Sequence, residues 1–372
     1  MALTWNRTIP LISADEIGYL GNAQALVTGT GPNMRDTTFY FAGFSLLLAP
    51  IAWLFNDPRE LYIGGLFINA AFMAASVPVL VRLAGDFGFA RSRLTPWFAA
   101  AVVLWPSPLY QANLVLPEIT LRFVLLSLIA VAFMLSRRGT WQTVVLFAVL
   151  ASAAYALHPR SIIVLPISGL MLVALATQRA IRWWQVALAI AVMALAYLLV
   201  GALNAYAQDV LWGYRSSAAG NLVKLALDIL DASVAMAMRT FGHYWYQMAS
   251  TLLLAPLGAI VAVTLLIRPA AITSKLPTAF VLLLVLGTGV AGAANMIEPE
   301  TVDWLIYWRF LDAIIPALLW VGMLGLMDAQ WRLPRTGHLR LECVLRRGNA
   351  VRRGSVDSCH PELCPLRRRA DP

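Results

Sequence analysis

The stretch Trp183–Ala207, WWQVALAIAVMALAYLLVGALNAYA, decides the fold class. It contains no charged side chain over its whole length. A helix needs about 20 predominantly apolar residues to cross a bilayer. Lipid offers no hydrogen-bond partner to the backbone, so only helices and closed barrels can span it. The stretch lacks the alternating polar pattern of a barrel strand, and it therefore predicts a transmembrane helix.

Further apolar runs recur along the chain, and they predict an all-α, polytopic transmembrane bundle of about ten helices over residues 39–330. Three of the runs are short unless flanking residues join them: Thr95–Tyr110, Phe123–Leu135 and Ala313–Met327. The others are Phe39–Phe55, Leu61–Val81, Gln142–Leu157, Ser161–Thr177, Gln247–Ile267 and Leu276–Met296.

The composition of the 372 residues supports this reading, because 60% are hydrophobic and only 13% are charged. Soluble domains average roughly 45–50% apolar and about 25% charged residues. An ordinary soluble enzyme, a disordered chain and a disulfide-built protein are therefore excluded. The net charge of +9 does not indicate nucleic acid, since the tail from Arg332 onward holds ten Arg against four acidic residues.

The basic turns indicate which ends of the helices face the cytoplasm, where Lys and Arg accumulate. One assignment of sides puts four of them together: Arg82–Arg93, Arg137/Arg138, Arg179/Arg182 and Arg268–Lys275. The loops left outside are Gln111–Arg122, His158–Arg160, Gln208–Tyr246 and Ile297–Arg309. Counting back through the first two runs places residues 1–38 inside, which conflicts with a functional role outside. One early run is then re-entrant or miscounted.

The tail, residues 331–372, is basic and free of apolar runs, and we expect it to be disordered. Two interpretations stay open: a frameshifted or degraded end, or a solvated segment that binds the lipid surface. It holds all three cysteines beside two histidines, but no C-x₂-C pair predicts zinc. These residues are His338, Cys343, Cys359, His360 and Cys364.

The acidic pair Asp15-Glu16 is the first candidate for chemistry. It opens an amphipathic stretch in which Ile17, Leu20 and Ala23–Ala25 form a weakly apolar face. One interpretation is a helix start whose carboxylates are solvated and favoured by the helix dipole. The other is a carboxylate at the membrane surface that acts as a general base. Residues 1–38 are then an acidic, non-cytoplasmic loop with an amphipathic helix.

Other polar residues stand between the apolar runs, where charge is costly and tends to mark function. Glu118 lies in a charged insertion, and its structural alternative is a turn with a Glu118–Arg122 pair. Arg160 follows His158-Pro159 and suits an anionic headgroup. Cations among aromatic residues suit a sugar or lipid-phosphate site, although interfacial belts look similar. These further candidates are Arg215, His243 and Arg309.

Four motifs in this order resemble the GT-C superfamily of polytopic membrane glycosyltransferases, in its bacterial branch similar to dolichyl-phosphate-mannose mannosyltransferases. The likeness covers roughly residues 10–330. The motifs are Asp15-Glu16, Pro117-Glu118-Ile119-Thr120-Leu121, His158-Pro159-Arg160 and Tyr307-Trp308-Arg309-Phe310-Leu311.

The resemblance implies transfer of a sugar from a polyprenyl-phosphate donor to a lipid, glycan or protein acceptor, outside a bacterial plasma membrane. Asp15 matches the acidic catalytic residue of the family, with Glu16 beside it, and Glu118 matches a second acidic residue. Arg309 matches the Arg of a Tyr-Gly-Arg-Tyr-like element, although Trp308 replaces its small residue. Arg160, Arg215 and Arg309 are the cations for the lipid phosphate. A divalent cation is compatible with this scheme but not implied.

The resemblance also implies a transmembrane helix before the acidic loop, which residues 1–14 do not supply. We therefore expect a chain truncated at both ends. A multi-spanning transporter or lipid flippase is the main alternative function. A non-catalytic remnant of a glycosyltransferase is the third interpretation.

Overall fold

The computed structural model describes residues 13–35, 39–55, 57–213, 226–227, 233–268, 272–294 and 311–328. Every regular element in these ranges is a helix, and they contain no strand. Residues up to Gly325 belong to one compact unit. Arg215, Arg309 and the tail 331–372 with its cysteines lie outside the described residues.

The described elements have the following order along the chain. They are α1 (Ser13–Thr28), α2 (Gly43–Leu54), α3 (Pro58–Asp86), α4 (Thr95–Val103), α5 (Pro106–Gln111), α6 (Glu118–Arg137), α7 (Trp141–Leu157), η2 (Pro159–Ile163), α8 (Val164–Thr177), α9 (Trp183–Ala207), η3 (Gln208–Trp212), α11 (Ser233–Ser250), α12 (Leu254–Ile267), α13 (Ile272–Ala294) and α14 (Ile315–Met327).

Five helical segments are long and apolar enough to cross a membrane: Pro58–Asp86, Glu118–Arg137, Pro159–Thr177, Trp183–Trp212 and Lys275–Ala294. A sixth is present if the bent pair α11–α12 counts as one span, while α2, α7 and α14 are shorter apolar helices. These lengths are compatible with a multi-pass membrane protein. The expected number of about ten spans is not confirmed.

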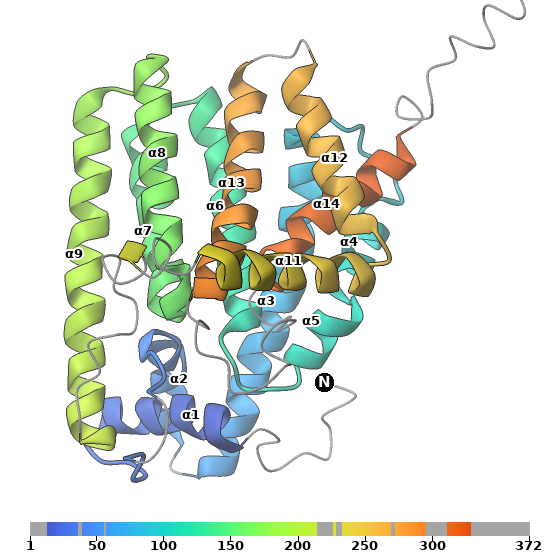
Figure 1. The fold of residues 1–372 in the computed structure, drawn as a ribbon. Helices are drawn as coiled ribbons and strands as arrows, with labels where there is room; N and C mark the ends of the chain where they lie inside the picture. Colours follow the sequence, from blue (N-terminus) through green and yellow to red (C-terminus); the bar gives the residue numbers. More distant parts are fainter. Residues whose placement is uncertain are drawn as a thin grey trace, which may run out of the picture. The chain divides into compact units, whose positions relative to one another are not determined.

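The first apolar run, Phe39–Phe55, does not form a span. Its helix α2 has 12 residues, which is about 18 Å at 1.5 Å per residue. The backbone N–H of Ala42 donates to Asn204 Oδ1 at 2.9 Å, and that of Met34 donates to the Leu211 carbonyl at 3.0 Å. These bonds hold α1 and α2 at the C-terminal end of α9, where α1 lies across the longer helices (Figure 1). The sidedness conflict therefore traces to counting this run as a crossing.

Two other runs are interrupted for local reasons. In Thr95–Tyr110, Pro106 has no backbone N–H to continue a helix, so α4 and α5 are separate. After α11, Leu252 and Leu253 both have positive φ, 50° and 65°, a region that L-residues avoid at a cost of about 1–2 kcal/mol each. The break bends α11 against α12 by 106°.

Helices α6 and α9 show the two extremes of packing. Of the 18 most apolar consecutive residues of α6, 83% are buried, because this helix contacts α3, α7 and α13. In the segment Trp183–Trp212, which contains α9, only 22% of the corresponding 18 residues are buried. Large side chains such as Leu195, Leu198 and Leu199 are exposed along it. An outer surface of this kind suits lipid, in which exposed leucines carry no hydrophobic penalty.

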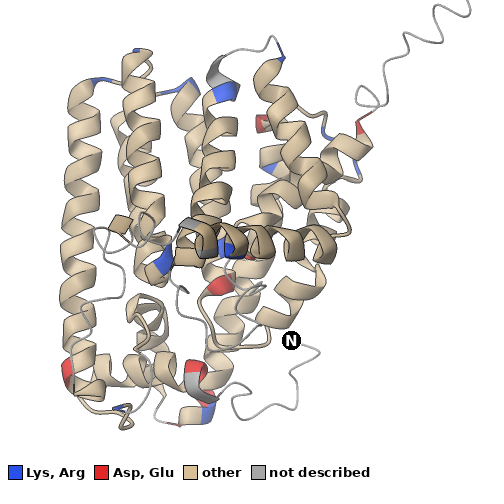
Figure 2. Cartoon of the chain, viewed as in Figure 1, with Lys and Arg blue, Asp and Glu red and all other residues tan. Residues whose placement is uncertain are grey.

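The basic turns gather at one end of the bundle. Figure 2 shows Lys and Arg at the upper ends of the helices, opposite α1. Arg137 joins α6 to α3, since its Nη1 lies 2.5 Å from Asp86 Oδ1. Gln185 Nε2 of α9 donates to the Gly139 carbonyl, between α6 and α7, at 3.0 Å. Three of the four turns that the sequence assigns to one side are thus connected to one another.

Candidate functional site

The acidic pair of the first candidate lies in the first turn of α1, and its two carboxylates have different surroundings. Glu16 is fully buried, and its Oε1 accepts a hydrogen bond from the backbone N–H of Val115 at 2.8 Å. Asp15 is half-buried, and its Oδ1 accepts from the Tyr40 hydroxyl at 2.8 Å. Glu16 therefore holds the segment before α6 in place, whereas Asp15 keeps a partly accessible, oriented carboxylate.

The apolar face predicted for α1 is partly wrong. Ala23 and Ala25 are buried as expected, but Ile17 is 36% exposed and Leu20 is half-buried. The buried face instead includes Asn22, whose Nδ2 donates to the Tyr40 carbonyl at 2.8 Å. Polar side chains take the buried face because backbone groups of neighbouring segments satisfy them.

A second group, here the buried polar cluster, consists of Ser107, Gln111, Glu118, Arg122, Gln247 and Asp312. Its centre is the carboxylate of Asp312, which accepts from Gln111 Nε2 at 3.0 Å and from Gln247 Nε2 at 2.9 Å. The Ser107 hydroxyl also donates to it. The cluster thus joins α5, α6, α11 and the turn before α14.

Arg122 is the cation of this cluster. Its Nη2 donates to Gln111 Oε1 at 3.0 Å and to the Asp312 carbonyl at 3.1 Å. Glu118 and Asp312 both act on it electrostatically. Glu118 begins α6, where the helix dipole favours a carboxylate. Glu118 and Arg122 are thus both buried in the first turns of α6, where they interact electrostatically, and they do not lie in a turn between helices.

Burial also affects the pKa of Asp312, which precedes α14 and lies outside the five spans. Removal from water raises the pKa of the Asp312 carboxyl above its ordinary value. Hydrogen bonds from Ser107 and Gln247, and the charge of Arg122, act in the opposite direction. The ionised cluster is therefore costly to maintain, which makes its partners important.

Helix α11 carries a third group of polar residues on one face, and it crosses in front of the longer helices (Figure 1). Arg239, His243, Gln247 and Thr251 recur every four residues, and all are buried. The opposite face exposes large apolar side chains, such as Phe241. Polar residues inside and apolar residues outside are the arrangement expected in contact with lipid.

Arg239 is the most unusual residue of this row. It is 3% exposed, and neither its Nε nor its Nη1 has a hydrogen-bond partner in the described part of the chain. A buried guanidinium left in this state costs free energy. An anionic ligand would satisfy it.

The remaining candidates among the described residues are Arg160 and His243, which lie in different helices. Arg160 is half-buried in η2, and its backbone N–H donates to His158 Nδ1 at 3.3 Å. His243 belongs to the α11 row. Within the described ranges, no group of three or more His, Cys, Asp or Glu side chains could hold a metal ion.

Sequence reasoning named Arg122 only as a partner of Glu118 and gave Asp312 and Arg239 no role in the site. One available signal was the four-residue spacing of Arg239, His243 and Gln247, which predicts a common helix face. No pattern in the sequence predicts the contact between Gln111 and Asp312, because these residues lie 201 positions apart.

No known family model matches this chain, and no curated protein is significantly similar to it.

Proposed function

We propose that this protein is a membrane glycosyltransferase that moves a sugar from a polyprenyl-phosphate donor to an acceptor hydroxyl. The reaction takes place on the non-cytoplasmic face of a bacterial plasma membrane, at the end of the bundle where α1 lies. In this proposal the fold is GT-C-like, and short apolar helices such as α7 and α14 add to the five or six candidate spans of the bundle. The observation that carries the proposal is the partly exposed Asp15 carboxylate, oriented by Tyr40 at the end opposite the basic turns.

The chemistry assigns Asp15 the role of general base. It takes the proton of the acceptor hydroxyl, whose oxygen attacks the anomeric carbon of the donor sugar. The bond between that carbon and the lipid-phosphate oxygen breaks, and the phosphate leaves with the electron pair. A positioned general base contributes typically 10²–10⁴-fold to a rate. Glu16 and Glu118 are positioning residues, because Glu16 holds Val115, which lies three residues before Glu118.

The leaving phosphate requires cations. Arg160, Arg215 and Arg309 remain the cations proposed from the sequence, with His243 as a further contact to the substrate. The structure supports adding Arg239, because its Nε and Nη1 are buried and have no hydrogen-bond acceptor in the described part of the chain. Charge-assisted hydrogen bonds from a preorganised guanidinium stabilise charge that develops in the transition state.

One observation favours the alternative function, a transporter or lipid flippase. The buried polar cluster places Arg122 and Asp312 inside the helical unit, and transporters bind substrates through such interior charges. Measuring lipid movement across proteoliposomes separates the two functions, since a flippase moves the intact donor and a transferase consumes it.

The decisive test uses the full chain in proteoliposomes with polyprenyl-phosphate mannose and a panel of hydroxyl acceptors. We expect Asp15→Asn to lower the rate of mannose transfer by about 10²–10⁴-fold, with unchanged thermal stability. Glu60→Gln is the matched control, because Glu60 is an exposed acid in the first turn of α3. Equal rates for Asp15→Asn and the unmodified chain would overturn the proposal. Repeating the assay with EDTA tests the divalent cation.

A further inference from the structure

An apolar groove of about 260 Å³ lies between α11, α12, α13 and α14. It is lined by small side chains of α12, Ala255 and Ala259, and by branched ones of α13 and α14, such as Leu318. Met248 of α11 and Leu286 of α13 belong to the same lining and are 39% and 54% exposed. The groove is therefore open to the outside between α11 and α13.

Two polar side chains also line the groove, and both are hydrogen-bonded within the protein. The Tyr244 hydroxyl donates to the Val285 carbonyl at 2.9 Å, and Gln247 Nε2 donates to Asp312 Oδ1 at 2.9 Å. What the groove presents to a ligand is therefore mainly hydrocarbon. A hydrocarbon chain suits such a space, because an empty groove leaves its lining without van der Waals partners.

The outer face of α11 connects this opening to lipid. Four large apolar side chains on it are exposed at spacings of four, three and four residues: Val234, Met238, Phe241 and Trp245. Met248, which lines the groove, continues the stripe after three more residues. Helix α11 crosses in front of the longer helices and is bent by 106° against α12 (Figure 1). An apolar stripe on a helix of this kind rests in the acyl chains, so a lipid chain reaches the groove along it.

Farther toward the N-terminus of α11, buried donors lack acceptors. Arg239 is 3% exposed, and its Nε and Nη1, like the Oγ1 of Thr240, have no hydrogen-bond partner among the residues that the structure describes. A guanidinium only donates and stays charged, so the group that it lacks is an anionic acceptor. A phosphate supplies several acceptor oxygens and forms charge-assisted hydrogen bonds with arginine.

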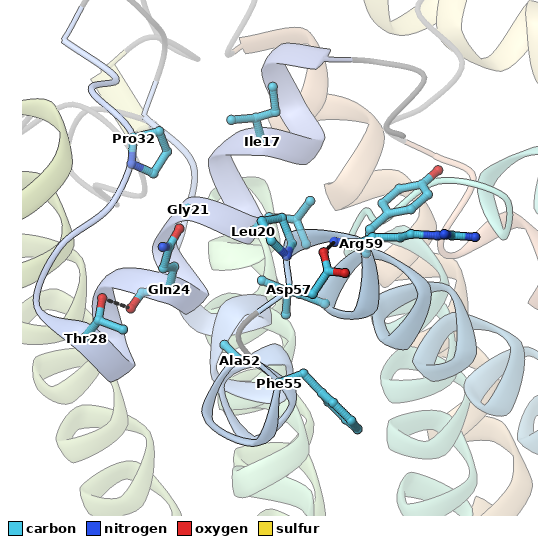
Figure 3. Close-up of a pocket in the computed structure, with 13 residues that line it drawn as sticks. Ile17, Leu20, Gly21, Gln24, Thr28, Pro32, Ala52, Phe55, Asp57 and Arg59 are labelled. Atoms are coloured by element: carbon cyan, nitrogen blue, oxygen red, sulfur yellow. Dashed lines mark hydrogen bonds between the residues drawn. The ribbon is translucent and has the colours of Figure 1, made fainter. Parts of the chain in front are cut away.

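A cavity of about 350 Å³ beside α1 differs in this respect (Figure 3). Three of its polar side chains, Gln24, Asp57 and Arg59, are exposed, so water solvates them. Asp57 also caps α3, where its Oδ1 accepts from the backbone N–H of Arg59 at 2.8 Å. The charges at this cavity are therefore satisfied without a ligand. The charge on α11 is buried, and a buried charge without a partner costs free energy that a ligand recovers.

Helix α11 carries both features on one face. Arg239, His243 and Gln247 recur every four residues and are buried, and Gln247 lines the groove. Arg239 and Gln247 are about 12 Å apart along the helix at 1.5 Å per residue. The groove is smaller than sites for drug-sized ligands, roughly 300–1,000 Å³, so it holds part of one chain. We propose that α11 binds a single-chain lipid phosphate, with the phosphate at Arg239 and the nearest part of its chain in the groove.

The identification of this lipid with the polyprenyl-phosphate donor rests on the proposed function, whereas the binding of a lipid phosphate does not. In the proposed reaction, Arg239 holds the phosphate from which the sugar departs. The groove holds the first isoprene units of the chain, and the rest of the chain extends into the bilayer. One helix thus positions both parts of the donor.

The test is native mass spectrometry of the full chain in detergent, titrated with a long-chain polyprenyl phosphate. Three further probes separate the contributions of head and chain: the polyprenol of the same length, inorganic phosphate, and phosphatidylglycerol, which has two chains. We expect polyprenyl phosphate to bind about tenfold or more tightly than each of them. Arg239→Gln should weaken its binding about 10–100-fold, because charge-assisted hydrogen bonds to the phosphate are lost. Arg59→Gln, which removes an exposed guanidinium, is the matched control.

Filling the groove tests the site for the chain. Ala259→Phe should weaken the binding of polyprenyl phosphate about tenfold. Leu286→Trp, at the exposed mouth of the groove, is a second filling variant if Ala259→Phe does not fold. Ile260→Phe adds the same ring to α12 at a position that is 64% exposed and does not line the groove, and it should bind normally.

Several results would overturn the proposal: equal affinity for polyprenyl phosphate and polyprenol, tighter binding of phosphatidylglycerol, or unchanged affinity in Arg239→Gln or in a folded filling variant. Failure of the proposed function is a different result. Tight binding of polyprenyl phosphate by a chain that transfers no sugar supports the lipid site and contradicts the glycosyltransferase. Sugar transfer that depends on Asp15, together with unchanged lipid affinity in Arg239→Gln, contradicts the lipid site alone.

Discussion

The two ends of the helical unit use charge in different ways. At the end with the basic turns, Asp86 pairs with Arg82 and Arg137, whose side chains are 46% and 43% exposed. Toward the other end, Arg122 and Asp312 are almost fully buried and bond to each other and to polar side chains from several helices. The two carboxylates are equally buried, with Asp86 6% and Asp312 5% exposed, and the difference lies in the arginines, which contact water only at the basic end.

The two groups of charges therefore have different roles: the Asp86 ion pairs connect helix ends, and the buried polar cluster builds a site. In the Asp86 ion pairs the carboxylate is buried but both arginine side chains remain in contact with water, so the pairs contribute modestly and mainly connect two helix ends. Burial removes water from the buried polar cluster, and only several well-formed hydrogen bonds offset the free energy of that desolvation. Its partners lie up to 205 positions apart in the chain. The cluster therefore fixes α5, α6 and α11 relative to one another near the acidic pair.

The largest effect on stability is expected from Arg122→Met. This change leaves the buried Asp312 carboxylate without its cation, and breaking a buried pair costs about 3–5 kcal/mol. Chemical unfolding of the purified chain in detergent measures the loss. The double variant Arg122→Met/Asp312→Leu should recover part of it, because Asp312 no longer supplies a buried charge, whereas the buried Glu118 carboxylate still lacks the Arg122 charge. A loss below about 1 kcal/mol for Arg122→Met would show that the cluster is not a structural network.

A smaller effect is expected from Asp86→Asn at the other end. Asp86 is buried, but its two arginine partners remain in contact with water, and pairs solvated in this way contribute about 0–1 kcal/mol each and are screened by salt. The destabilisation should therefore stay near 1 kcal/mol and shrink between 0.05 and about 1 M salt, where the Debye length falls to about 3 Å. If Asp86→Asn matched Arg122→Met, the distinction between the two ends would be wrong.

Much of the fold was predictable because hydropathy reports directly on helices in lipid. The runs around Trp183–Ala207 and Phe123–Leu135 became α9 and α6, and the helix at Asp15-Glu16 formed as expected. The number of crossings was harder to predict. Helix α2 has the hydropathy of a span but too few residues. The chain turns between α11 and α12 at Leu252 and Leu253, where no Gly, Pro, Asn or Asp predicts a turn.

The site was less predictable than the fold, because its parts meet through tertiary contacts. Sequence alone identified Asp15 and Glu16 as a pair, but only the structure separates them, through Tyr40 on one side and Val115 on the other. Charge indicated that Glu118 and Arg122 were unusual. That Arg122 binds Gln111 and Asp312 depends on the packing of α6, and no local pattern encodes it.

The most direct test of the account is the sidedness of the two ends. In a chain whose cysteines Cys343, Cys359 and Cys364 are replaced by serine, single cysteines are introduced at Glu60, near α1, and at Thr177, near the basic turns; both positions are exposed. A membrane-impermeant thiol reagent is then applied to intact cells. We predict labelling at position 60 and none at position 177 until the membrane is opened. Labelling at position 177 alone would place α1 in the cytoplasm and contradict the proposed reaction face.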